Sequence, residues 1–177
     1  ISGETIAKEE GITREDADSY SLKSHSRASE SWFKGWTSRE ITPIGGLARD
    51  EGVRDVSSLE TLSKLKPVFM QDGIVTAGNS SQVSDGAAAL LICSREAADE
   101  NGWDVLARIL DFETSGVEPS RVMSAPIPCI EALLSRAELS AEDIDLYEHN
   151  EAFATASCGI KRHFDIPEGK FNIQGGA

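Results

Sequence analysis

The first third of the chain is mainly polar, and its start and stop signals predict helices. Residues 2–10 form a short predicted helix that Gly11 ends. Thr13 can cap a second helix, with Asp16 three residues later as in a capping box, and this helix continues to about Lys34. The remaining elements predicted here are a strand at residues 40–44 and a short helix at residues 58–64.

From residue 74 onward, apolar strands alternate with helical segments. In residues 144–149, Ile144 and Leu146 alternate with Asp145, as in a strand. Strands and helices that alternate in this way, with mostly apolar strands, are typical of a parallel α/β sheet covered on both faces. The predicted strands are a short one from Ile74, residues 87–93, 105–117 and 144–149, and one beginning at Phe171; the predicted helices are residues 95–101, a segment after Pro119 that continues to Ala137, and residues 152–160.

The stretch HNEAFATASCG, residues 149–159, places Asn150 and Glu151 directly before a run of small uncharged residues. No residue from Ala152 to Ile160 is charged, whereas an amphipathic surface helix would show a polar face. We therefore expect a helix that is buried on all sides, with the polar pair at the edge of the core. Asparagine is a favoured N-cap and glutamate complements the helix dipole, so capping explains the pair as well as a functional site does.

The charge of the chain narrows the classes of partner. The chain carries 30 acidic and 17 basic side chains, a net charge of −13, so we expect it to bind neither nucleic acid nor a membrane surface. Cys93, Cys129 and Cys158 are widely spaced, as is typical of reduced thiols in an intracellular protein. We expect a cytoplasmic location, with the organelle left open. The histidines lack metal-binding spacing, so no metal site is predicted.

The loop AGNSSQVSDGAA, residues 77–88, combines glycine, serine, asparagine and aspartate, which form tight turns and local hydrogen bonds. Such a loop can simply connect two elements, or its backbone and hydroxyl groups can line a ligand channel. It lacks the lysine of a phosphate-binding GxxxxGK[ST] loop and contains no GxGxxG pattern. The composition alone leaves both interpretations open.

Three motifs, in the same order and at similar separations, resemble those of the thiolases, the acyl-CoA C-acyltransferases. They are GNSSQVSDGAA at residues 78–88, NEAFA at residues 150–154 and NxxGGA at residues 172–177. The likeness covers nearly the whole chain, since residues 2–28 resemble the helical loop domain of the family and residues 57–69 the stretch before its serine-containing loop. The fold that this implies is α/β: two layered halves with buried central helices between their sheets, which fits the uncharged helix.

The resemblance divides the chain into three parts. Residues 1–64 correspond to a remnant of the loop domain, residues 65–103 to the end of the N-terminal half and residues 104–177 to the start of the C-terminal half. Because the chain begins without Met, we expect a fragment of a longer protein. The nucleophilic cysteine of the family would lie before Ile1, and its catalytic histidine and second cysteine after Ala177. We therefore expect the segment alone to be inactive.

By resemblance, the activity is the exchange of an acyl group between CoA thioesters, by thiolysis of a 3-oxoacyl-CoA or by the reverse Claisen condensation, as in fatty acid metabolism. CoA and acyl-CoA are then the substrates, and no cofactor is implied. Asn150 corresponds to the asparagine that positions a water in an oxyanion hole, which polarises the thioester carbonyl as the enolate forms. Family members are commonly dimers or tetramers, which implies a homo-oligomer.

Six further residues match substrate-binding positions of the family. Ser81 corresponds to a serine beside the pantetheine, Arg54 to an arginine near the CoA nucleotide, and Thr61 to a serine near that arginine. The residues that match the apolar lining of the acyl end are Phe69, Met123 and Phe153. Without the resemblance, ordinary core packing would explain the aromatic residues and the methionine, and a solvated loop charge would explain Arg54.

Departures from the family pattern keep other functions open. Cys158 lies among small residues, so we expect burial to raise its pKa and leave it unreactive. His149 stands where a small residue is expected, and Gln82 makes the loop closer to that of 3-ketoacyl-CoA thiolases than to acetyl-specific members. The alternatives are a non-catalytic acyl-CoA or lipid carrier of the sterol-carrier type, against which the asparagine of NEAFA argues, and a structural remnant. Acyl-chain length and reaction direction stay open.

Overall fold

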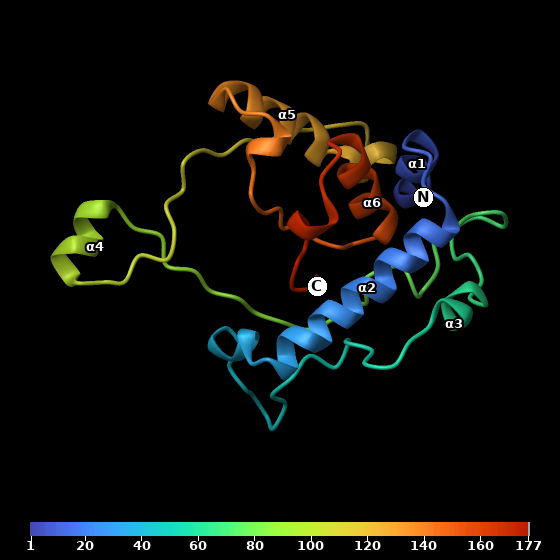
Figure 1. The fold of residues 1–177 in the computed structure, drawn as a ribbon, viewed down its shortest axis with the longest axis horizontal. Coiled ribbons are helices and arrows are strands. Elements are labelled where there is room, and N and C mark those ends of the chain that lie inside the picture. Colours follow the sequence, from blue (N-terminus) through green and yellow to red (C-terminus); the bar gives the residue numbers. More distant parts are fainter. Residues whose placement is uncertain (177) are drawn as a thin grey trace.

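Helices supply most of the regular structure in residues 1–176, the part of the chain that the computed structural model describes (Figure 1). The α-helices are α1 (Ser2–Glu9), α2 (Arg14–Phe33), α3 (Leu59–Ser63), α4 (Arg95–Asn101), α5 (Pro126–Ala137) and α6 (Ala154–His163). Short 3-10 helices are η1 (Trp36–Arg39), η2 (Pro119–Ser124), η3 (Ala141–Asp143) and η4 (Glu168–Lys170).

The helices predicted from capping signals are confirmed. Thr13 and Asp16 form a capping box at the start of α2: the Asp16 amide donates to the Thr13 hydroxyl at 3.1 Å, and the Thr13 amide donates to the Asp16 carboxylate at 2.9 Å. Gly11 and Gly102 follow α1 and α4 with positive φ angles of 64° and 65°, a conformation that glycine adopts without strain. Local signals were sufficient here because each of these boundaries depends on residues within one turn.

Helix α6 lies at the centre of the packed part of the molecule, among α1, α2 and α5 (Figure 1). Its residues are buried from Ala154 to Ser157 and again at Gly159 and Ile160, which confirms the predicted buried helix. Small residues permit this packing: a Cβ atom on Gly159 would lie 2.8 Å from Ile6 Cδ1, and one on Gly3 would lie 3.2 Å from Thr155 Oγ1. Helices α1 and α6 therefore approach one another closely.

The apolar core lies at the C-terminal end of α6. Ile160, Ile166 and Phe171 are buried together. The Phe171 ring meets Tyr20 of α2 edge-on and is stacked with Tyr147, in each case with 6.4 Å between ring centroids. The core thus joins α2, α6 and the last segment of the chain.

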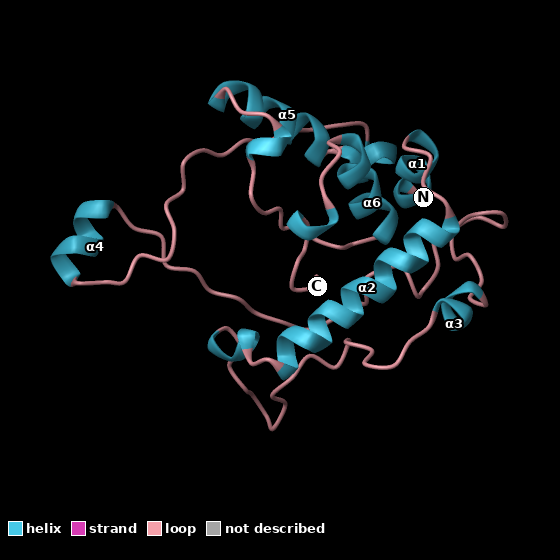
Figure 2. Cartoon of the chain, viewed as in Figure 1, coloured by secondary structure: helices cyan, strands magenta, loops and turns pink. Residues whose placement is uncertain are grey.

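The predicted strands are wrong as strand ladders: residues 1–176 contain isolated bridges but no strand, and Figure 2 shows no strand colour in the ribbon. The bridges are Ile44 with Leu47, Pro67 with Thr76, Ser80 with Phe153, and Tyr147 with Phe171. The last is parallel, so the predicted strands at residues 144–149 and from Phe171 do lie side by side. Residues 40–44, by contrast, only enter a tight turn.

The strongest strand patterns fall in the extended region, residues 82–117, which runs outside the helical packing and carries α4 (Figure 1). Most of its large apolar side chains are exposed, Leu106 to 97% and Leu90 to 89%. A strand is stabilised by hydrogen bonds to a neighbouring strand, and residues 1–176 place no such neighbour beside this region. The apolar pattern is therefore present without the ladder that it normally forms.

Candidate active site

The serine-containing loop (residues 77–88) and the NEAFA segment (residues 150–154) lie side by side. The Ser81 amide donates to the Ala152 carbonyl at 3.0 Å, and the Ala154 amide donates to the Asn79 carbonyl at 2.9 Å. Ser80 and Phe153 form the antiparallel bridge between these two bonds. Two motifs that are about 70 residues apart in sequence are thus joined by their backbones, and the exposed Ser81 side chain lies next to the start of α6.

The buried side chain of Asn79 holds the serine-containing loop in place. Its Oδ1 accepts a hydrogen bond from the Thr76 amide at 2.8 Å, and its Nδ2 donates to the Ile74 carbonyl at 3.0 Å and to Asp18 Oδ1 at 2.9 Å. Asp18 belongs to α2 and forms an ion pair with Arg14 at 2.7 Å. The loop is therefore attached to a long, capped helix.

The third motif meets the second through Asn172. The Asn172 carboxamide accepts a hydrogen bond from the His149 amide at 2.8 Å and donates to the His149 carbonyl at 2.8 Å. The two glycines that follow pack against α2 and NEAFA: a Cβ on Gly175 would lie 2.5 Å from the Ala28 amide nitrogen, and one on Gly176 would collide with Glu151. Ala177, which ends this motif, lies outside the described residues.

Glu151, the second residue of NEAFA, has a structural role. Its carboxylate accepts hydrogen bonds from the Tyr20 hydroxyl at 2.6 Å, the Ser24 hydroxyl at 2.5 Å and Asn172 Nδ2 at 2.7 Å. Burial, together with the nearby Glu151 charge, raises the pKa of Tyr20 far above its usual value, so this hydroxyl stays protonated and acts as a donor. Glu151 is thereby fixed to α2.

Asn150 lies between these anchored residues, and its own side chain is exposed. Within residues 1–176 its carboxamide makes no hydrogen bond. The interpretation of Asn150 as a helix cap is wrong, because α6 begins at Ala154 with Phe153 at the N-cap position and no side-chain cap. The carboxamide is therefore free to bind a molecule outside the described chain.

Of the apolar candidates, Phe69 contacts Phe153 of NEAFA, and Met123 lies in the neighbouring η2. The rings of Phe69 and Phe153 meet edge-on with 5.9 Å between their centroids, and Phe153 also packs on Gly3 of α1. Met123 is half-buried in η2, which packs against α1 and α6. Phe69 and Ser81 thus contact NEAFA, the segment that contains both Asn150 and Phe153.

Arg54 and Thr61 lie farther from this cluster. Arg54 is exposed, and its amide donates to His25 Nδ1 at 3.2 Å. The Arg54 loop touches the serine-containing loop, where Gly52 packs against the Gln82 side chain. Thr61 lies in α3, and its hydroxyl pairs with that of the N-cap residue Ser58 at 3.0 Å. Among the described residues, no hydrogen bond joins either side chain to Asn150 or Ser81.

His149, which precedes Asn150, and Cys158 of α6 have shifted pKa values. Burial lowers the pKa of His149, whose Nδ1 lies 3.0 Å from the Ser157 hydroxyl, so the ring is neutral near pH 7. Burial raises the pKa of Cys158 to about 12, as its small-residue surroundings led us to expect. A thiol that stays protonated is a poor nucleophile. Cys93 is exposed and Cys129 half-buried. Within residues 1–176, no cluster of three or more His, Cys, Asp or Glu residues could hold a metal ion.

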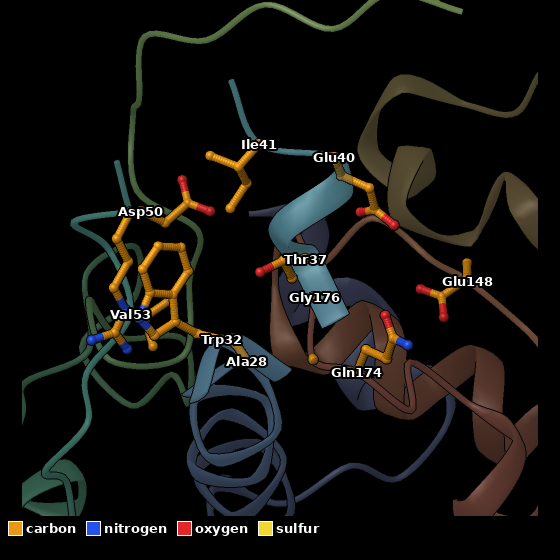
Figure 3. Close-up of a pocket in the computed structure, with 12 residues that line it drawn as sticks. Ala28, Trp32, Thr37, Glu40, Ile41, Asp50, Val53, Glu148, Gln174 and Gly176 are labelled. Atoms are coloured by element: carbon orange, nitrogen blue, oxygen red, sulfur yellow. The ribbon is translucent and has the colours of Figure 1, made fainter. Parts of the chain in front are cut away.

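A cavity of about 440 Å³ lies near the C-terminal end of α2, bordered by Gly175 and Gly176 of the third motif. Trp32, Thr37 and Glu148 are among its lining residues (Figure 3). Three carboxylates line it, those of Glu40, Asp50 and Glu148. Its one lining cation, Arg49, binds Asp55 through two hydrogen bonds of 2.8 and 2.5 Å. An acidic cavity of this kind is a poor match for a phosphate-bearing ligand, and none of the candidate site residues lines it. No described helix is long and apolar enough to cross a membrane.

Sequence models of two thiolase domains match almost the entire chain: the thiolase N-terminal domain matches residues 1–96, and the thiolase C-terminal domain matches residues 103–177. The chain belongs to the thiolase family. The finer division of the chain at residues 64 and 103 stays a prediction.

Several thiolases are similar along the full chain. A probable acetyl-CoA acyltransferase of Staphylococcus aureus is 38% identical over 100% of this chain and 47% of its own length. A peroxisomal 3-ketoacyl-CoA thiolase of Encephalitozoon cuniculi is 43% identical over 98% of this chain and 45% of its own length. The chain thus spans about half the length of the curated thiolases that it matches.

Solved thiolase structures share the fold. Human mitochondrial 3-ketoacyl-CoA thiolase in complex with CoA superposes with a TM-score of 0.94 and 40% identity, over 99% of this chain and 45% of that one. The acetyl-CoA acetyltransferase of Bacillus anthracis gives a TM-score of 0.91 and 35% identity, over 99% and 46%. The predicted thiolase fold is confirmed, and the extended region is included in the match although it pairs with no strand among the described residues.

Two residues around NEAFA had no assigned role in the sequence-based prediction of this thiolase site. Asn172 was visible as the first residue of the third motif, which was the only signal that it could contribute. Tyr20 gave no signal, because its hydrogen bond to Glu151 joins positions 131 residues apart. A long-range contact of this kind becomes visible only when the chain is folded.

Proposed function

We propose that the whole protein is an acyl-CoA C-acyltransferase that transfers acyl groups between CoA thioesters. The observation that supports this most is the free carboxamide of Asn150, held where the serine-containing loop, NEAFA and the third motif meet. Membership of the thiolase family and the likeness to a thiolase in complex with CoA agree with CoA and acyl-CoA as substrates.

In the proposed reaction, a 3-oxoacyl-CoA is cleaved by the thiol of CoA into acetyl-CoA and a shortened acyl-CoA, or the reverse condensation occurs. The Asn150 side chain donates a hydrogen bond to a water, which in turn stabilises the developing negative charge on the thioester oxygen. None of the three cysteines of this chain suits the role of acyl carrier: Cys158 is held in the thiol form, and none lies in a thiolase cysteine motif. We propose that a part of the protein outside this chain supplies it.

The remaining candidates would bind successive parts of acyl-CoA, from the acyl end near Asn150 to the nucleotide farther away. Ser81 would contact the pantetheine and Phe69 and Phe153 the acyl end, since all three border NEAFA. Met123, from η2, would complete the apolar lining. Arg54, which makes no ion pair within residues 1–176, and Thr61 would contact the CoA nucleotide from farther away.

The proposal also covers the binding partners, location and oligomeric state of the protein. A net charge of −13 argues against binding to nucleic acid or to a membrane surface. A cytoplasmic location and a homo-oligomer complete the proposal, and both follow from the sequence and the family resemblance.

The deciding experiment measures thiolysis of acetoacetyl-CoA and of a longer 3-oxoacyl-CoA by the whole protein and by its Asn150→Ala variant. Loss of one oxyanion-hole donor costs about a hundredfold to a thousandfold in turnover, and we expect a loss of this size. Asn101→Ala, the same change at the exposed end of α4, is the matched control and should leave turnover unchanged.

Equal turnover by the Asn150→Ala variant and the unaltered protein would rule out this role of Asn150. Binding of acyl-CoA without turnover by the unaltered protein would support the alternative of a non-catalytic carrier. The relative rates on the two substrates would also report the preferred chain length.

A further inference from the structure

The buried carboxamide of Asn172 has four hydrogen-bond contacts within the described chain. The residue is 1% exposed. Its Oδ1 accepts from the His149 amide, and its Nδ2 lies within hydrogen-bond distance of the His149 carbonyl at 2.8 Å, Glu151 Oε1 at 2.7 Å and the Tyr20 hydroxyl at 3.1 Å. Three of these four contacts are made to the residues immediately before and after Asn150.

These contacts restrain the backbone on both sides of Asn150. Asn172 binds the amide and the carbonyl of His149 together, as a neighbouring strand would. On the other side, its Nδ2 binds the carboxylate of Glu151, which Tyr20 and Ser24 also hold. Because the Asn150 side chain makes no hydrogen bond of its own within residues 1–176, its direction is set by this restrained backbone.

Asn172 is itself held firmly by the rest of the fold. Its backbone has a φ angle of 42°, in the left-handed region that asparagine tolerates better than most residues. Its amide donates to the Tyr147 carbonyl at 2.9 Å. From α2, Arg27 Nη1 donates to the carbonyls of Phe171 at 2.9 Å and of Asn172 at 3.3 Å. The restraint on Asn150 is thus transmitted from α2.

We infer that Asn172 is a positioning residue for the reaction: through His149 and Glu151 it fixes the backbone that aims the Asn150 carboxamide at its water. This inference rests on the proposed function of Asn150. Asn172 touches no substrate in this arrangement, so its contribution passes entirely through Asn150.

The sharpest variant is Asn172→Asp in the whole protein. Aspartate has nearly the same shape and also tolerates a positive φ, and it can still accept from the His149 amide. It has no N–H for the His149 carbonyl, however, and it places a second carboxylate against Glu151. A misplacement of about 1 Å can cost up to about a hundredfold in rate, so we expect kcat to fall by about tenfold to a hundredfold with little change in KM.

A double-mutant cycle separates positioning from a general structural effect. If Asn172 acts through Asn150, adding Asn172→Asp to Asn150→Ala should lower kcat no further. A merely structural role would lower kcat by a similar factor in both backgrounds. A rescue variant supplies the second test: Glu151→Gln combined with Asn172→Asp restores the hydrogen bond between residues 151 and 172, with the glutamine as the donor and the aspartate as the acceptor. It should recover part of kcat, because only the hydrogen bond to the His149 carbonyl is still missing.

Hydrogen exchange supplies a readout that needs no activity. The His149 amide donates to Asn172 Oδ1, so Asn172→Asp should accelerate exchange across residues 148–152 while leaving α4 unchanged. Asn101→Asp, the same chemical change on α4, should alter neither kcat nor exchange in residues 148–152.

The outcomes distinguish the two proposals. Absence of thiolysis by the unaltered protein would overturn the proposed function, and the exchange data would still report whether Asn172 holds residues 148–152. Thiolysis that is normal in the Asn172→Asp variant, or a full additional loss of kcat in the double variant, would overturn the positioning role alone.

Discussion

The packed region around α6 and the extended region at residues 82–117 carry similar apolar patterns but meet different surroundings. In the packed region Phe171 is 1% exposed and contacts Tyr20 and Tyr147. In the extended region Phe112 is 78% exposed. The difference is not one of residue type. It arises because α2 and the segment at Tyr147 pack against the Phe171 ring, whereas the Phe112 ring stays exposed although Arg136 donates a hydrogen bond to the Phe112 carbonyl.

This difference shows what an apolar pattern can and cannot predict. The pattern indicates that burial of the segment would stabilise the protein, by about 25 cal/mol for each Å² of apolar surface removed from water. It does not state which segment covers it. The uncharged helix that follows NEAFA packs against α1, α2 and α5 within this chain, and the candidate site lies at its start.

The largest effect expected from this contrast is a matched pair of truncations. Phe171→Ala removes a fully buried ring and should lower the free energy of unfolding by about 3–5 kcal/mol. Phe112→Ala removes an exposed ring and should change it by less than about 0.5 kcal/mol in the 177-residue chain. Urea titrations of the two variants, followed by circular dichroism, measure both values.

The same pair in the whole protein sharpens the comparison. A cost at Phe112 that rises toward the cost at Phe171 would show that the extended region gains a partner there. Equal costs at the two positions in the 177-residue chain would contradict the contrast that the structure presents.

A second pair of variants tests the backbone. Gly175 has a φ angle of 86° and lies against the backbone of α2, so Gly175→Ala adds a strained conformation and a steric clash. We expect a loss of about 2–4 kcal/mol in the free energy of unfolding. Gly116 has no atom within 4 Å of the position of a Cβ, so Gly116→Ala should cost less than about 0.5 kcal/mol in the 177-residue chain. A loss at Gly175 as small as the one at Gly116 would show that Gly175 is not tightly packed.

The fold was predictable from sequence wherever the determinants are local. Thr13 and Asp16 defined the start of α2, and glycines defined the ends of α1 and α4. The strands were predicted from their own side chains, but a ladder also requires a neighbour, and none of the described residues pairs along residues 87–93 or 105–117. Their backbone path nevertheless agrees with that of solved thiolases.

The site was predictable in its motifs but not in its connections. Asn150 was identified by the family resemblance, while its interpretation as a helix cap failed because α6 begins four residues later, at Ala154. The contacts that anchor its neighbours, from Tyr20 and Asn172, come from α2 and the last segment of the chain. Contacts between such distant positions depend on the packed fold, which no local pattern specifies.

The smallest effect concerns pH and arises only in the packed region, since residues 82–117 contain no histidine. Burial lowers the pKa of His149 below the ordinary histidine value of about 6.5, with the Glu151 charge opposing this in part. As the pH falls through about 6.5, the unfolded chain therefore takes up a proton at this histidine while the folded chain does not. At this histidine the unfolded state then binds more protons, so His149 lowers the free energy of unfolding as the pH falls from 7 to 5.

A variant isolates this contribution. In His149→Phe the ring can still pack against Phe171, which lies 6.0 Å from the His149 ring centroid, but the titrating group is gone. The variant should lose less stability than the unaltered protein between pH 7 and pH 5, while His25, whose pKa burial also lowers, should preserve part of the slope. An identical slope for both proteins in urea titrations at a series of pH values would mean that His149 is solvated, and that the region beside Asn150 is more open than its packing indicates.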